Sequence, residues 1–168
     1  MLFSCGSDND EKFSGITKTD ETGKVYQTDI DDWRPWQYVG QGKVPTSFVQ
    51  SSPVQIAGDT VRPIDTTFRM SGYPNPCTDH FTLNFTNPET ATIVFELYDK
   101  PGHLFRRYQP ILIQAGLFMN SFDLPHWADD LKTEVFRDGI YRLYIKRYTS
   151  NGAIYQTYGD IQIDRKGY

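Results

Sequence analysis

The stretches Phe81-Thr82-Leu83-Asn84-Phe85 and Thr92-Ile93-Val94-Phe95-Glu96-Leu97 decide the fold that this sequence predicts. Every second residue of the first stretch is apolar, and the same alternation places Ile93, Phe95 and Leu97 on one side of the second. Successive side chains of a β-strand point to opposite faces, so both stretches are predicted to be strands with one buried face. An Asn-Pro pair between them is a turn signal. We therefore expect two neighbouring antiparallel strands that contribute to the same core.

Further short strands are predicted at regular intervals towards the C-terminus. Turn residues separate them, notably Lys100-Pro101-Gly102-His103 and Ser150-Asn151-Gly152. About seven strands, with no long helical pattern among them, predict an all-β fold, namely an antiparallel immunoglobulin-like β-sandwich. The additional strands are expected at residues 104–108, 111–114, 118–122, 140–148 and 153–164.

The composition agrees with a β-rich domain and argues against two classes of protein. Aromatic residues make up 15% of the 168 residues, and flat rings pack well on a pleated sheet. The formal net charge is -4 and the sequence has no basic stripe, so binding to nucleic acid is not expected. No run approaches the roughly 18 apolar residues that a membrane-spanning helix needs.

Catalytic signatures are also missing from the sequence. His80, His103 and His126 have no nucleophile motif beside them, and neither Gly-x-Ser-x-Gly nor His-Glu-x-x-His occurs. We therefore expect a protein that is not an enzyme, has no cofactor and does not act on a small-molecule substrate.

The N-terminal residues Leu2-Phe3-Ser4-Cys5 resemble the lipobox of bacterial lipoproteins, in which cleavage leaves the cysteine as a lipidated N-terminus. The polar, acidic tract Gly6-Ser7-Asp8-Asn9-Asp10-Glu11 that follows is similar to that of surface-exported lipoproteins of the Bacteroidota. The resemblance implies a lipid anchor on Cys5 and a location at the outer membrane or cell surface. An ordinary cysteine, or a disulfide between Cys5 and Cys77, is the alternative.

Residues 6–45 are rich in Asp, Gly, Thr and Lys and poor in aliphatic residues, so they are predicted to form an extended tether. Thirty to forty extended residues reach on the order of 100 Å at roughly 3.3 Å per residue. The tether contains the carboxylates Asp29, Asp31 and Asp32, which are weak candidates for calcium binding, with a solvated acidic turn as the alternative. It also contains three aromatic rings, which are expected to dock on the sandwich or to contact a partner. These are Trp33, Trp36 and Tyr38.

Four motifs in the order Tyr73-Pro74-Asn75-Pro76, Leu97-Tyr98-Asp99 with Gly102, Leu124-Pro125 and Gly139-Ile140-Tyr141 carry a family resemblance. Together they resemble the C-terminal type A sorting domain of the type IX secretion system. The related immunoglobulin-like domain of flagellar hook-cap proteins has the same plan. The resemblance covers residues 73–164 and implies a seven-stranded sandwich that serves as a delivery address and not as an enzyme.

The sequence thus divides into a lipobox remnant at residues 1–5, a tether at 6–45 and a β-sandwich domain at 46–168. We expect a lipoprotein that presents its sandwich to a protein partner in the cell envelope, as an accessory subunit of an outer-membrane assembly. A predicted edge strand from Ser47 to Ile56 could accept a strand of that partner. Secretion cargo is one alternative, and a carbohydrate-binding sandwich is another. In the latter case Trp33, Trp36 and Trp127 are the candidate sugar-stacking rings.

Overall fold

The computed structural model describes residues 13, 15–46, 69–78, 80–123 and 137–164, and these contain β-strands and no helix. All of the strand pairs are antiparallel. The predicted all-β, antiparallel class is therefore confirmed. The predicted edge strand at 47–56, together with Cys5 and Trp127, lies outside the described residues.

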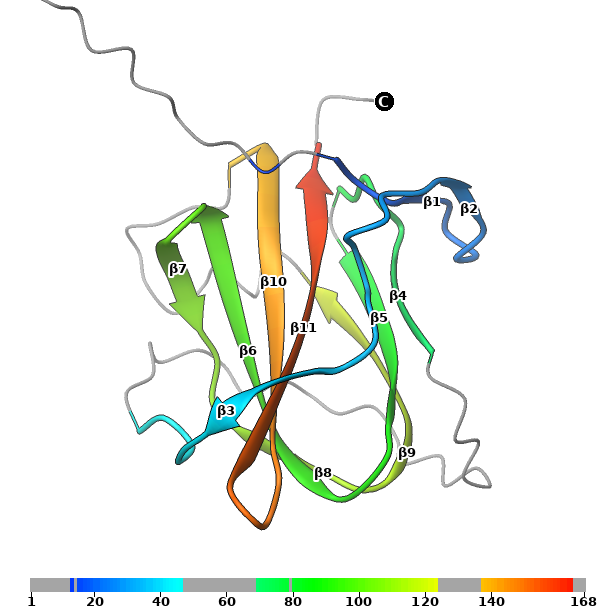
Figure 1. The fold of residues 1–168 in the computed structure, drawn as a ribbon. Helices are drawn as coiled ribbons and strands as arrows, with labels where there is room; N and C mark the ends of the chain where they lie inside the picture. The colour runs from blue at the N-terminus through cyan, green and yellow to red at the C-terminus, as the bar shows by residue number, and fades with distance from the viewer. Residues whose placement is uncertain (1–12, 14, 47–68, 79, 124–136, 165–168) are drawn as a thin grey trace, which may run out of the picture.

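The larger sheet has six strands in the order β3-β11-β10-β6-β7, with β8 pairing to β6 beside that path (Figure 1). Its central hairpin keeps one register from Gly139 opposite Ile163 to Tyr148 opposite Ile154, because the predicted turn at Asn151-Gly152 joins strands of matching length. The strands are β3 (Gln37–Gln41), β6 (Ala91–Lys100), β7 (His103–Arg107), β8 (Ile111–Ile113), β10 (Gly139–Tyr148) and β11 (Ala153–Ile163).

The smaller sheet has three strands in the order β4-β5-β9, and a separate two-stranded hairpin precedes both sheets in the chain. In Figure 1 the smaller sheet lies beside and behind the larger one, and β5 is drawn to the right of β11. The strands of the sheet are β4 (Met70–Tyr73), β5 (His80–Asn87) and β9 (Gly116–Asp123), and those of the hairpin are β1 (Lys18–Thr19) and β2 (Val25–Gln27).

The two sheets enclose one hydrophobic core, which gives the molecule a sandwich-like architecture. The rings of Phe95 on β6 and Phe118 on β9 meet across the sheets with centroids 6.3 Å apart. Leu143 on β10 and Ile161 on β11 belong to the same buried cluster. The predicted inward-facing residues are all fully buried, because alternation along a strand assigns them to one face. They are Phe81, Leu83 and Phe85 on β5, and Ile93, Phe95 and Leu97 on β6.

The prediction of an extended tether does not hold for residues 15–46, which form part of the folded body. Strand β3 joins the larger sheet beside β11, and Trp33 is a core residue with 8% of its surface exposed. Its ring lies so close to the backbone of Gly72 on β4 and Gly159 on β11 that an added Cβ there would lie 2.8 Å and 2.1 Å from it. A few ring contacts thus hold a segment whose average composition is too polar to predict folding.

Asn75, in the Tyr73-Pro74-Asn75-Pro76 motif, ties this N-terminal segment to β11. The side chain is fully buried, and its Nδ2 donates to the carbonyl oxygens of Thr17 at 2.9 Å and Asp160 at 2.8 Å. Its Oδ1 accepts the backbone N–H of Gln162 at 2.8 Å. The backbone of Asn75 also pairs with that of Thr19 in both directions. Every polar atom of this amide side chain is therefore satisfied by backbone from two distant segments.

Candidate binding surface

The outer face of the larger sheet, which points away from the core, carries the richest combination of rings and charges in the described structure. The core-facing positions of β6, β10 and β11 are odd-numbered, so the even-numbered residues point outwards. Register pairs place Tyr98 beside Arg142, and Tyr144 beside both Glu96 and Tyr158. We call the following residues the outer face: Glu96, Tyr98, Arg142, Tyr144, Lys146, Gln156, Tyr158 and Asp160.

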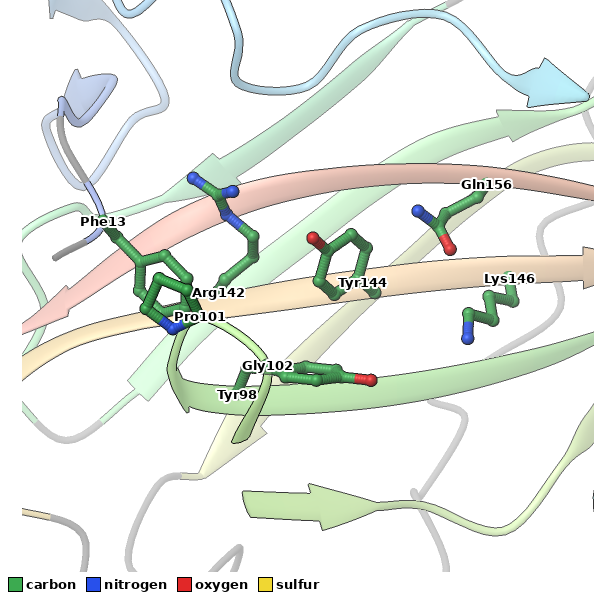
Figure 2. Close-up of a pocket in the computed structure, with 8 residues that line it drawn as sticks. All are labelled: Phe13, Tyr98, Pro101, Gly102, Arg142, Tyr144, Lys146 and Gln156. Atoms are coloured by element: carbon green, nitrogen blue, oxygen red, sulfur yellow. The ribbon is translucent and has the colours of Figure 1, made fainter. Parts of the chain in front are cut away.

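A groove of about 300 Å³ crosses this face (Figure 2). Phe13 and Pro101 stand at one end of it, and Lys146 and Gln156 stand at the other. Tyr144 lies between them along β10. The described residues that line it are Phe13, Tyr98, Pro101, Gly102, Arg142, Tyr144, Lys146 and Gln156.

Three tyrosines form a continuous aromatic row along the outer face. Tyr98 and Tyr144 meet edge-to-face, with centroids 5.1 Å apart and an interplanar angle of 76°. Tyr144 and Tyr158 follow at 5.4 Å and 58°. Aromatic pairs in such arrangements are stabilised by their quadrupoles as well as by packing, so the three rings support one another.

Arg142 is held in place from three sides. Its Nε and Nη2 donate to the two carboxylate oxygens of Asp160, each at 2.7 Å. The guanidinium also lies over the rings of Phe13, at 4.5 Å, and Tyr158, at 4.2 Å. Hydrogen bonding to Asp160 raises the pKa of Arg142 further above its ordinary value. The cation is therefore permanently charged and already neutralised by its bidentate partner.

Glu96 is, with Asp160, one of two buried anions of the outer face, each with 1% of its side chain exposed. Arg107 Nε lies 2.6 Å from one carboxylate oxygen and Lys146 Nζ lies 2.7 Å from the other. Burial by itself raises the pKa of Glu96, but the hydrogen bonds and charges of Lys146 and Arg107 outweigh it and leave the pKa below its ordinary value. The outer face thus contains charges that are paired within the protein.

The rings that the sequence singles out in the N-terminal segment do not come together on one surface. Trp33 stacks on Phe81 in the core, with centroids 6.3 Å apart. Trp36 packs edge-on against Phe85 at 5.7 Å, and its Nε1 donates to the carbonyl oxygen of Thr86 at 3.0 Å. Tyr38, on β3, is 60% exposed and leans against Tyr155. Two of these three rings therefore serve packing, and Tyr38 faces solvent.

The three carboxylates that the sequence offers for calcium accept hydrogen bonds from the protein itself. Asp29 accepts the backbone N–H of Asp31 at 2.8 Å, and Asp31 pairs with Arg34. Asp32 Oδ2 accepts from the backbone nitrogen of Thr17 at 2.7 Å. Within the described residues, no group of three or more His, Cys, Asp or Glu side chains is arranged to hold a metal ion.

The second cysteine, Cys77, is 1% exposed, and its thiol lies 3.4 Å from the carbonyl oxygen of Gln162. Its backbone pairs with β11 at Ile163, so it packs where the Pro-Asn-Pro segment meets the larger sheet. Cys77 therefore packs as a small buried hydrophobe.

Comparison of the sequence with models of known protein families gives no match, and comparison with curated proteins gives no significant match. Among the residues that the structure describes, no helix has the length and apolarity needed to cross a membrane. The inference of function therefore depends on the chain's own surfaces.

Proposed function

We propose that this chain is a non-enzymatic lipoprotein, anchored in a membrane through a lipid on Cys5, that presents a β-sandwich to a protein partner in the cell envelope. The finer fold class, an immunoglobulin-like sandwich related to the sorting domain, is part of the same proposal. Its role is that of an accessory subunit of an outer-membrane assembly. It needs no cofactor beyond the lipid.

The observation that carries the interaction role is strand β3. It is the last described strand on its side of the larger sheet, next to β11. Its side chains Tyr38 and Val39 are 60% and 52% exposed, so the strand offers apolar surface as well as a strand edge. An edge strand with accessible backbone is the usual site at which a partner adds a strand of its own. Within the described residues, this edge is the candidate partner surface, and the edge strand expected at 47–56 stays a prediction.

The folded N-terminal segment changes the expected distance between the sandwich and the lipid. Phe13 contacts Arg142 on the outer face, and eight residue steps separate Cys5 from Phe13. A fully extended chain spans about 3.3–3.6 Å per residue, so the anchor lies within roughly 30 Å of the Phe13 contact. The proposed lipoprotein therefore holds its sandwich close to the membrane surface, and the 100 Å reach of a free tether does not apply.

Photocrosslinking in cells of the source organism tests the partner. A photoreactive phenylalanine analogue at Tyr38 should give one discrete adduct in the envelope fraction. The matched control is the same analogue at Tyr26 on β2, an equally exposed tyrosine (62%) on a different strand pair. Equal adducts at both positions, or none at Tyr38, would contradict the assignment of β3 as the partner edge.

The anchor is tested separately by fractionation of Cys5→Ser. The variant should move from the membrane to the soluble fraction, and mass spectrometry of the unsubstituted protein should find acyl groups on Cys5. If Cys5→Ser stays in the membrane fraction while the Tyr38 adduct persists, the anchor is wrong and the partner edge stands.

A further inference from the structure

We propose that the groove on the outer face binds a neutral carbohydrate, taking one hexose unit against Tyr98 and Tyr144. This site is distinct from the β3 edge and does not depend on the membrane anchor. It also differs from the tryptophan site that the sequence suggests, because Trp33 and Trp36 are used in packing.

The shape of the groove suits a small cyclic unit. Its volume of about 300 Å³ is at the lower end of the range for small-molecule sites. Phe13 and Pro101 stand at one end of the groove, and Lys146 and Gln156 stand at the other (Figure 2).

The aromatic row supplies the apolar part of the site. The edge-to-face pair of Tyr98 and Tyr144 lines the groove, and the hydroxyl group of Tyr98 donates to Glu96 Oε2 at 3.4 Å. One face of a hexose ring carries C–H groups that pack against aromatic carbon, and its edge carries hydroxyl groups. Because Tyr144 also packs on Tyr158, its ring is already oriented before a ligand arrives.

The polar part of the site offers donors and acceptors that already form ion pairs within the protein. Arg142 is paired with Asp160, and Lys146 is paired with Glu96, which also pairs with Arg107. An ammonium group has three donors, and a carboxylate oxygen has more than one lone pair, so both pairs keep hydrogen-bonding capacity. Gln156 adds an amide with both a donor and an acceptor. Hydroxyl groups, which donate and accept, match this lining.

The ion pairs also argue against an anionic ligand. A phosphate or carboxylate ligand would have to compete with Asp160 for Arg142 and with Glu96 for Lys146, and each of these ion pairs is 2.7 Å long. A neutral ligand that is rich in hydroxyl groups requires no such displacement.

Solution NMR on the full chain tests the proposal, with maltohexaose, cellohexaose, laminarihexaose and mannohexaose as probes at millimolar concentration. At least one probe should shift the backbone amide signals of Tyr98, Tyr144 and Gln156. Tyr144→Ala should weaken that probe's binding about tenfold, which corresponds to about 1.4 kcal/mol. Gln156→Ala, at a partly exposed side chain, serves as a second variant in case the first disturbs the sheet, and it should weaken binding in the same direction.

The matched control is Tyr38→Ala, which removes an exposed tyrosine from β3 and should leave the affinity unchanged. No shift with any of the probes would overturn the proposal, and so would shifts that persist equally in Tyr144→Ala and Gln156→Ala. Binding of a neutral peptide with the same shifts, in the absence of sugar binding, would also overturn it in favour of a peptide groove.

Discussion

The side chain of Asp32 joins the N-terminal segment to β11 by accepting the backbone N–H of Asp160 at 2.9 Å, across 128 positions of sequence. Its second oxygen accepts the backbone N–H of Thr17 at 2.7 Å. Burial raises the pKa of Asp32 to about 6, although both backbone hydrogen bonds act in the opposite direction. One carboxyl group therefore links two segments, and it titrates at a higher pH than an ordinary aspartate does.

This relationship predicts a pH dependence of stability. The folded chain holds the Asp32 proton up to about pH 6, whereas the unfolded chain releases it near its ordinary value of 3.8. Between these values the folded state binds more protons, so the free energy of unfolding should fall as pH rises from about 4 to about 6. We expect the Asp32 contribution to this fall to be on the order of 1–3 kcal/mol, measured by urea denaturation at several pH values.

Asp32→Asn carries no titrating group at this position, so its stability should change less with pH over the same range. Asp31→Asn changes the neighbouring carboxylate, which pairs with Arg34 at the surface, and should keep the slope of the unsubstituted chain. Identical slopes in Asp32→Asn and the unsubstituted protein would show that another group is responsible.

Asn75→Ala should lower the free energy of unfolding by about 2–4 kcal/mol, because it leaves two carbonyl oxygens and one N–H without partners in a buried site. The matched control is Asn84→Ala, which removes a single hydrogen bond to Ser71 on the outer side of the smaller sheet. That change should cost less than about 1 kcal/mol. Equal losses of unfolding free energy in the two variants, measured by chemical denaturation, would mean that Asn75 does not stabilise the contact between the N-terminal segment and β11.

The strands expected at residues 104–108, 111–114, 118–122, 140–148 and 153–164 correspond to β7, β8, β9, β10 and β11, and the strands with strict alternation of apolar residues are also predicted correctly. Strands β5 and β6 have this pattern, and their inward sides are fully buried. Strand β3 has no such pattern in Gln37–Gln41, and its residues are mostly exposed, since it joins the sheet through its backbone. Periodicity reports which face is buried, so it cannot detect a strand that buries neither face.

The outer face was not predicted for a different reason. Tyr98, Tyr144 and Tyr158 each occupy an ordinary outward position of a strand, and nothing in their local sequence marks them. They become one row because β6, β10 and β11 are neighbours in the sheet, and the strand order is not readable from alternation. The core position of Trp33 likewise depends on Gly72 and Gly159, which lie far from it in the sequence.

Gly159→Ala should destabilise the protein by about 2–3 kcal/mol, since the added Cβ would lie 2.1 Å from Trp33 Cε2 and the ring has no room to move in the core. The control is Gly42→Ala, where the added atom meets only the end of the Ile154 side chain at 3.0 Å. A double variant with Trp33→Phe should lose less stability than the two single changes together, because a smaller ring relieves the overlap. Strict additivity in thermal unfolding would contradict the close packing of Trp33 on β11.

Glu96→Gln should cost roughly 2–4 kcal/mol near neutral pH, because it removes the charge that Arg107 and Lys146 share on the outer face. The pKa of Glu96 lies below its ordinary value, so its contribution is present above about pH 4.5 and is lost as pH falls through the folded pKa. The difference between the unsubstituted protein and Glu96→Gln should therefore shrink in acid.

Glu89→Gln is the matched control, since Glu89 is 53% exposed and pairs with Arg147 at 3.3 Å. Its cost should stay below about 1 kcal/mol and decrease in high salt, whereas the cost at the buried Glu96 should depend little on salt. Urea denaturation of both variants at low and high salt distinguishes the two cases, and a salt-sensitive cost at Glu96 would show that solvent reaches the pair.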